Sequence, residues 1–185
     1  HTFRGRTLLE TLIEAPMVLP PAVAGVGLLL AFGRRGIWGS YLESLGIALA
    51  FTPAAVVMAQ LFVAAPFYVK SAVGGFLEVD QELEQAAELD GASAWQVFRH
   101  VTVPLSLPAL LGGAVMTWAR ALGEFGATIL FAGNLPGRTQ TMPLAIYLGF
   151  ELDLSVALTL AVILLACSFG VLILTRGLLK LDLGR

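Results

Sequence analysis

Four long, nearly uncharged apolar runs constrain this chain more than any other feature of its sequence. They cover about residues 7–32, 44–69, 105–131 and 154–176. A bilayer is crossed by roughly 20 apolar residues rising about 1.5 Å each, so every run is long enough to span one. Only 13% of the residues are charged, against about 25% in a soluble domain. We therefore expect an all-α, polytopic membrane helical bundle with at least four transmembrane helices, forming a single transmembrane domain over residues 1–185.

Prolines interrupt the first run near its middle, at Pro16, Pro20 and Pro21. A proline inside a helix removes a hydrogen bond and clashes with the preceding turn, so this run predicts a kinked or partly unwound helix. The freed carbonyls then need partners within protein. Pro16, Pro20 and Pro21 either shape a gate or simply kink a packed helix.

Lysine and arginine are distributed unequally between the two sides of the predicted bundle, and cytoplasmic loops carry the excess of these residues. Seven fall on one side, which we assign to the cytoplasm: Arg4, Arg6, Lys70, Arg99, Arg176, Lys180 and Arg185. Three fall on the other side: Arg34, Arg35 and Arg138. The connection GNLPGRTQTMP, residues 133–143, then faces out of the cell.

Several function classes find no support in the composition. The single cysteine, Cys167, excludes a disulfide or a cysteine metal framework within this chain. The net charge of −2 comes with no basic arm, so we expect no nucleic-acid partner. Neither Lys70 nor Lys180 lies in a GxxxxGK sequence, so we expect this chain to bind no ATP, and no cofactor of its own. The start at His1, before FRGR, suggests the interior of a longer protein.

A polar stretch at about residues 70–104 separates the second and third runs. Six of the thirteen acids lie between residues 78 and 90. Good helix formers fill residues 81–90, and Gly91 suits a left-handed C-cap after them. Ser93 and Gln96 have the spacing of a capping box, which predicts a second short helix over about 94–100. Pro104 is expected to separate this helix from the third run.

Trp95 and Phe98 lie three residues apart and therefore on one face of the second short helix. Two large aromatic side chains on such a helix need a surface that buries them. They either pack on the protein's own spans or in the lipid interface, or they dock in a groove of a cytoplasmic partner.

The polar stretch resembles the EAA motif of the membrane-spanning subunits of bacterial and archaeal ABC importers. That pattern is Glu-Ala-Ala, three residues, Gly, nine residues, Ile, one residue, Leu-Pro. This chain has the same spacing, with Gln in place of the leading Glu and Val in place of both Ile and Leu: Gln85, Ala86, Ala87, Gly91, Val101, Val103 and Pro104. Glu84 is adjacent to the leading position but out of register.

The resemblance implies that the short helix is a coupling helix seated in a cleft of a separate ATP-hydrolysing subunit. The residues expected to take part in this ATPase coupling are Gln85, Ala86, Ala87, Asp90, Gly91, Ala92, Ser93, Trp95, Phe98, Arg99, Val101 and Pro104. ATP and Mg would be bound by the partner ATPase.

The resemblance extends over essentially the whole chain, and the fold it implies is that of a type I ABC importer permease. Residues 3–25, 45–69 and 118–147 look most like the molybdate and tungstate branch, with sulfate and thiosulfate permeases next. The implied assembly is a homodimer in the prokaryotic cytoplasmic membrane, with two ATPase subunits and an extracytoplasmic oxyanion-binding protein. Family members usually carry further spans before the segment that starts this chain.

The third run contains Arg120, Glu124 and Thr128, each one helical turn from the next. An intramembrane arginine costs roughly 2.5–3.5 kcal/mol, so it faces protein or water rather than lipid. Either Arg120 offers positive potential to a passing oxyanion, or Arg120 and Glu124 pair and hold helices together. Small residues at Ala119, Gly123 and Ala127 allow close helix approach beside this stripe.

Asn134 and Arg138, in the outward connection, are candidates for contact with the binding protein, although such loops are usually solvated connections. A rival of another class is an intramembrane enzyme, for which the polar residues would be Glu14, Arg120, Glu124 and Asp153. No HExxH, GxSxG or pair of span aspartates supports it. A passive channel or a structural anchor is the remaining alternative.

Overall fold

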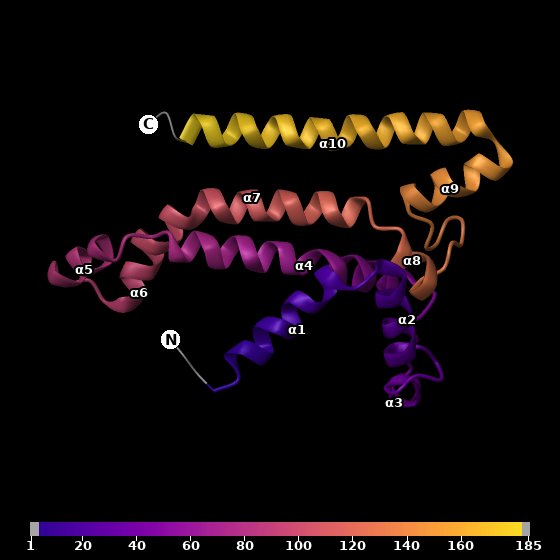
Figure 1. Cartoon of the computed structure of the whole chain (residues 1–185), viewed down its shortest axis with the longest axis horizontal. Helices are drawn as coiled ribbons and strands as arrows, with labels where there is room; N and C mark the ends of the chain where they lie inside the picture. Colours follow the sequence, from indigo (N-terminus) through magenta and orange to yellow (C-terminus); the bar gives the residue numbers. More distant parts are fainter. Residues whose placement is uncertain (1–3, 183–185) are drawn as a thin grey trace. The chain divides into compact units, whose positions relative to one another are not determined.

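Every regular element is a helix in the part of the chain that the structure, a computed structural model, describes: residues 4–182, with side chains at 4–173 and 175 (Figure 1). This confirms the all-α prediction. Residues 1–3 and Arg185, and the side chains of Arg176 and Lys180, lie outside the described part. The helices are α1 (Arg6–Val18), α2 (Pro21–Phe32), α3 (Gly39–Ser44), α4 (Pro53–Leu77), α5 (Gln81–Leu89), α6 (Ala94–Val97), the π-helix η1 (Phe98–Thr102), α7 (Val103–Leu122), α8 (Gly126–Phe131), α9 (Met142–Leu152) and α10 (Leu154–Asp182).

Three described helices are long and apolar enough to cross a membrane: Pro53–Leu77, Ala94–Leu122 and Leu154–Ile173. Helices α1 and α2 pass the same test only as a pair, and the chain bends by 119° between them. The pair is therefore a broken span or a re-entrant loop, which makes three or four spans in the described part of the chain. The chain is a multi-pass membrane protein.

The predicted irregularity of the first run is a complete break between α1 and α2. Pro16 is accommodated inside α1. Leu19 and Pro20 both precede a proline, which disfavours the helical region for them, and both are extended, with ψ of 134°. Pro21 then starts α2 at its first turn, where a missing N–H costs nothing.

The membrane helix of the second run was predicted to begin at about residue 44, but α4 begins at Pro53. Between α3 and α4 the backbone takes positive φ at Gly46 (74°) and Phe51 (61°), which a helix excludes. The Thr52 hydroxyl accepts from the Ala55 N–H at 3.4 Å and Pro53 follows at the first helical position. This threonine–proline pair is a helix start signal readable in the sequence.

The third run is not one helix over residues 105–131, because α7 ends at Leu122 and α8 begins at Gly126. The stripe predicted on a single helix is therefore divided, with Arg120 on α7, Glu124 in the break and Thr128 on α8. The small-residue row is divided in the same way: Ala119 and Gly123 are exposed, and Ala127 is buried.

Pro104 does not separate the short helix from α7, so that prediction is wrong. The helix runs without interruption from Ala94 to Leu122, through the π-helical turn η1. The Val103 N–H bonds to the Phe98 carbonyl, five residues back, immediately before Pro104, which has no N–H to give. The wider turn thus accommodates the proline inside a continuous helix.

The predicted outward connection is irregular from Ala132 to Thr141, and an eleven-residue helix that was not predicted, α9, follows it. Helix α10 continues past the predicted end at residue 176, to Asp182.

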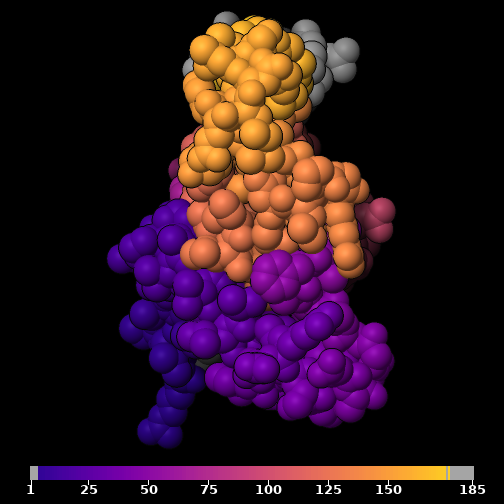
Figure 2. Space-filling view, turned by 90° about the vertical axis from the view of Figure 1, so that its right-hand side faces the viewer, coloured from indigo at the N-terminus to yellow at the C-terminus, as the bar shows by residue number. Residues whose placement is uncertain are grey.

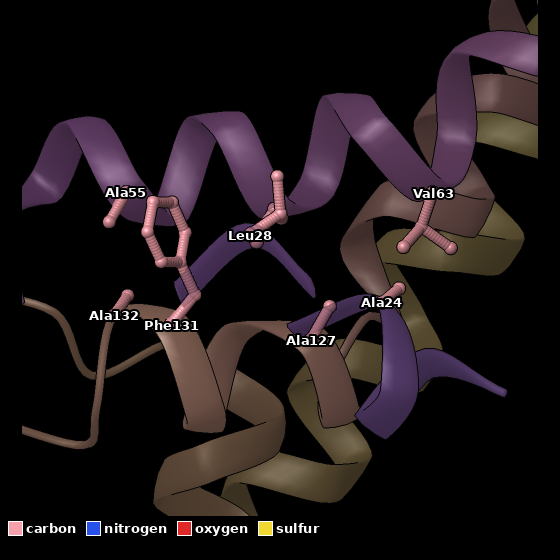
Figure 3. Close-up of a cluster of buried hydrophobic side chains, with 8 residues drawn as sticks. Ala24, Leu28, Ala55, Val63, Ala127, Phe131 and Ala132 are labelled. Carbon is pink, nitrogen blue, oxygen red and sulfur yellow. The ribbon is translucent and has the colours of Figure 1, made fainter. Parts of the chain in front are cut away.

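The chain divides into two compact units. Unit 1 comprises His1–Pro66 and Ala119–Phe169, and unit 2 comprises Phe67–Trp118 and Gly170–Arg185. The hydrophobic core of unit 1 joins α2, α4 and α8; its buried members are Ala24, Leu28, Ala55, Ala59, Val63, Ala127, Phe131 and Ala132 (Figure 3). On one face of unit 1, the orange segment after α8 lies next to the violet segment before α4 (Figure 2). There the Phe51 N–H donates to the Phe131 carbonyl at 3.2 Å.

Candidate functional site

The polar segment of unit 2 begins with α5, which is capped at both ends. The Asp80 carboxylate accepts from the Glu82 N–H at 2.9 Å and so caps the first turn. At the other end, Gly91 has φ of 89°, as the predicted left-handed cap requires. The Gly91 N–H bonds to the Glu88 carbonyl and the Ala92 N–H to the Ala87 carbonyl, which is a Schellman motif.

The predicted capping box at the start of α6 is confirmed. The Gln96 side-chain oxygen accepts from the Ser93 N–H at 2.8 Å and from the Ser93 hydroxyl at 2.9 Å. Val97 is buried, and α6 passes directly into η1 and α7. The short helix is thus the first part of a 29-residue helix.

The two predicted aromatic residues lie side by side on the surface of this segment. Trp95 is 65% exposed and Phe98 is 42% exposed, with 5.7 Å between their ring centroids. Phe76, at the end of α4, extends the group, since its ring centroid lies 6.2 Å from that of Phe98. Part of Phe98 is therefore covered by the chain's own α4, whereas Trp95 is mostly uncovered in this chain.

Other predicted coupling residues line a groove of about 380 Å³ between α5 and the helix that follows. Its walls are formed by Ala87, Asp90, Gly91, Ala92, Gln96, Val97, His100 and Val101. Gln85 and Ala86 lie outside the groove and are exposed on α5, as are Arg99 and Pro104 on their own helix.

Glu84 has a partner that the sequence reasoning missed. The Thr102 hydroxyl donates to the Glu84 carboxylate at 2.5 Å, which connects α5 to η1. Eighteen residues separate the two, so no local spacing rule reports the contact. A carboxylate one position before Gln85 thus holds α5 against the helix that carries Trp95.

A second polar cluster lies in unit 1, at the break between α7 and α8. Glu124 is 1% exposed, and its carboxylate pairs with the Arg120 guanidinium at 2.8 Å. Its other oxygen accepts from the Ala127 N–H at 2.8 Å, inside the first turn of α8. One buried acid therefore joins the end of α7 to the start of α8. Thr128 is fully buried, and its hydroxyl has no partner in the described part of the chain.

The two broken helices meet at this place. A Cβ on Gly126 would lie 3.0 Å from Pro21 Cβ, and a Cβ on Gly25 would lie 2.8 Å from the Ala127 carbonyl. Helices α2 and α8 therefore pack backbone against backbone. Pro20 and Pro21 are exposed at the start of α2, next to the α8 end of the break.

In the connection after α8, Asn134 and Arg138 take different positions. The Asn134 amide donates to the Leu144 carbonyl at 3.4 Å, at the start of α9, whereas Arg138 is exposed. The connection is closed on itself by Thr139, which is 2% exposed and whose hydroxyl accepts from the Leu135 N–H at 3.1 Å. Of the two candidates, Arg138 is the one presented to the surroundings.

Broken membrane helices, with a capped polar segment between two long ones, define a multi-pass integral membrane protein. The fold is shared with a chain of the solved structure titled "Inward facing conformations of the MetNI methionine ABC transporter: CY5 native crystal form". The TM-score is 0.69 at 18% identity, over 96% of this chain and 75% of that one.

The chain belongs to the family described as "Binding-protein-dependent transport system inner membrane component", which matches residues 1–179. The "Putative molybdenum transport system permease protein YvgM" of Bacillus subtilis is 47% identical over 81% of this chain and 66% of its own length. The "Molybdenum transport system permease protein ModB" of Escherichia coli is 45% identical over 79% and 64%. A "Probable sulfate transport system permease protein cysT" of Chlorokybus atmophyticus is 37% identical over 82% and 53%. The chain thus spans less than two thirds of the curated relatives that it matches.

Proposed function

We propose that this chain is the permease part of an ATP-driven importer for an inorganic oxyanion, with molybdate or tungstate first and sulfate second. The observation that carries the proposal is the identity of 45–47% to relatives named as molybdenum transport permeases, against 37% to one named for sulfate. The protein would lie in the cytoplasmic membrane of a prokaryote.

The proposed mechanism is alternating access and involves no covalent chemistry on this chain. Two copies related by a two-fold axis would enclose the pathway, because the three or four spans of the described residues do not surround one. A binding protein would deliver the oxyanion to the outward-open dimer while ATP keeps the cytoplasmic side closed, and hydrolysis would reopen that side. Arg138 is then a candidate contact for the binding protein.

The ATPase subunit would dock on the exposed aromatic face of α6 and η1. Trp95, at 65% exposure, is a large apolar side chain on a segment whose caps hold it in one conformation. Uncovered apolar surface beside a groove is typical of a protein-docking site. Gln85, Asp90 and Ala92 lie on or next to the groove and are proposed as further contacts.

For Arg120 the geometry favours the structural reading over direct attraction of the oxyanion. Its guanidinium is within 2.8 Å of a carboxylate that is 1% exposed. The paired charges largely cancel at a distance, so an approaching anion meets little net positive potential there. We propose that Arg120 and Glu124 hold the α7–α8 break, and that the oxyanion is chosen mainly by the binding protein.

Docking is tested by co-purification of the chain with its partner ATPase. At Gly91 only the positive φ of 89° opposes a side chain, because a Cβ added there would meet no atom within 4 Å. Gly91→Asp, which adds a charge beside the groove, and deletion of Ala94–His100 should abolish association. Gly91→Asn is the matched control, because asparagine tolerates this conformation better than most residues and adds no charge. Association that persists in both variants would remove the docking proposal.

The oxyanion is tested on the cognate binding protein by calorimetric titration with molybdate, tungstate and sulfate. We expect molybdate and tungstate to bind at least a hundredfold more tightly than sulfate. Tight sulfate binding with weak molybdate binding would instead favour the second candidate.

A further inference from the structure

Within unit 2, two serine side chains join α4 and α7 by hydrogen bonds that run in opposite directions. The Ser71 hydroxyl, on α4, donates to the Ala109 carbonyl of α7 at 2.7 Å. The Ser106 hydroxyl, on α7, is oriented toward the Gly75 carbonyl of α4 at 3.2 Å and toward the Thr102 carbonyl at 2.8 Å. Ser106 is 1% exposed. Ser71 thus donates to the backbone of α7, and Ser106 shares its single proton between its own helix and the backbone of α4.

Two buried glycines let the backbone of each helix lie directly against a side chain of the other. A Cβ on Gly75 would lie 2.4 Å from Ala109 Cβ, and a Cβ on Gly113 would lie 2.6 Å from Ser71 Cβ. Neither position has room for a methyl group. The preceding glycines, Gly74 and Gly112, have no such atom within 4 Å. Close approach is therefore confined to one face of each helix, the face that also carries the serine bonds.

The polar segment lies at the end of this helix pair and is joined to both helices (Figure 1). On one side, three residues join α4 to α5, and on the other α6 continues into α7 through η1. Two further contacts join these two sides to each other. The Glu84–Thr102 hydrogen bond links α5 to η1, and the Phe76–Phe98 contact links the end of α4 to η1. A displacement of α6 is thus passed to both helices together.

From this geometry we propose that Ser71, Gly75, Ser106 and Gly113 form a clamp, the α4–α7 clamp, that makes the two helices and the polar segment move as one body. In this role the four are positioning residues, which act through the helices that they join. Their role rests on the proposed function, in which the ATPase pulls on α6. With the clamp loosened, ATP would still be hydrolysed, but less of the displacement would reach the spans.

The test uses the complete importer in proteoliposomes, with its ATPase and binding protein, and measures molybdate taken up per ATP hydrolysed. Gly75→Ala adds one methyl group at the closest point of the clamp, and Gly74→Ala adds the same group in open space. We expect Gly75→Ala to lower uptake per ATP at least fivefold, with ATP hydrolysis and co-purification kept within twofold. Gly74→Ala should behave as the unaltered chain. The double variant Gly75→Ala/Ala109→Gly removes the Ala109 methyl group that the new one would meet. It should therefore recover most of the lost uptake per ATP.

If the unaltered importer transports molybdate, equal uptake per ATP by Gly75→Ala and Gly74→Ala would overturn the clamp. A loss that Ala109→Gly does not recover would also overturn it. No ATP-dependent uptake by the unaltered importer would instead count against the proposed function. Should Gly75→Ala fail to assemble, Ser71→Ala/Ser106→Ala adds no atoms and takes its place. It should lower the ratio at least twofold, and an unchanged ratio would overturn the clamp.

Discussion

Glu124 closes the gap between α7 and α8 by bonding to both at once, through Arg120 on one side and the Ala127 N–H on the other. The two partners differ in exposure: the Arg120 side chain is 30% exposed and that of Glu124 only 1%. Arginine left alone can turn toward water or headgroups, but a carboxylate left alone cannot. Loss of the Arg120 side chain should therefore lower the free energy of unfolding more than loss of the Glu124 charge.

Arg120→Ala should destabilise the protein more than Glu124→Gln does. Removing one partner of a buried pair costs about 3–5 kcal/mol, because a buried charge remains unpaired. Glutamine at 124 removes the charge but keeps an acceptor for the Ala127 N–H. Thermal unfolding of the detergent-solubilised protein should rank the variants in this order, with Arg120→Ala/Glu124→Gln between Arg120→Ala and the unaltered chain. The reverse ranking would contradict the expected asymmetry between Arg120 and Glu124, and no destabilisation by either variant would show that the pair does not hold the break. Transport unchanged by Arg120→Ala would remove this residue from both proposed roles.

Phe51 adopts a backbone conformation that only glycine takes easily, with φ of 61°. A left-handed conformation costs other residues about 1–2 kcal/mol. Phe51→Gly should therefore be more stable than Phe51→Ala by about 1 kcal/mol, the opposite of the usual order inside regular structure. Both variants lose the ring that lies against Gly133, so their difference in thermal unfolding reports the backbone alone. Equal stability would mean that φ at this position relaxes.

The π-helical turn η1 sets the rotation of the aromatic face of α6 relative to α7. A one-residue change in helical register rotates everything beyond it by about 100°. Pro104→Ala restores an N–H that can bond to the His100 carbonyl, and so favours an ordinary α-helical turn.

Pro104→Ala should separate Glu84 from Thr102 and weaken association with the ATPase. Cysteines at 84 and 102, in a Cys167→Ser background that removes the native cysteine, report the first effect by disulfide cross-linking. We expect an efficient cross-link with Pro104 and a several-fold weaker one with alanine. Pro108→Ala, one turn further into α7, is the control and should leave the cross-link unchanged.

At the scale of elements, local signals in the sequence predicted the caps of the polar segment well, but not its continuation past Pro104, and they predicted the spans less well. Gly91 and the Ser93–Gln96 box act within a few residues, and both are confirmed. The helix start at Pro53 was readable from Thr52 and Pro53, but hydropathy alone placed it nine residues too early. The prolines at 20 and 21 predicted an irregularity, and the structure shows a complete break there.

The contacts that join elements far apart in the chain could not be predicted in this way. The α7–α8 break contains no proline, and it depends on Glu124 reaching Ala127 while α8 packs on Gly25 of a distant helix. Likewise, no local pattern in a single sequence predicts the contact of Glu84 with Thr102 or that of Ser71 with Ala109. Capping depends on near neighbours, whereas helix packing depends on which faces meet.

For the whole molecule, the proposed assembly has two copies of this chain and two ATPase subunits. The exposure of α10 indicates that lipid or a partner chain surrounds it. Only 6% of its most apolar window is buried within the described chain. Light scattering of the purified complex should give the mass of two permeases and two ATPases. A complex with one copy of each would contradict the two-fold arrangement.

The proposed function requires that this chain carry an oxyanion across a membrane at the expense of ATP hydrolysed elsewhere. It is measured as molybdate uptake into proteoliposomes that hold the complete importer, with ATP supplied on the ATPase side and the binding protein on the other. We predict uptake that requires both ATP and the binding protein and that Gly91→Asp abolishes. Uptake independent of ATP, or no uptake of molybdate, tungstate or sulfate by a correctly assembled complex, would contradict the proposed function.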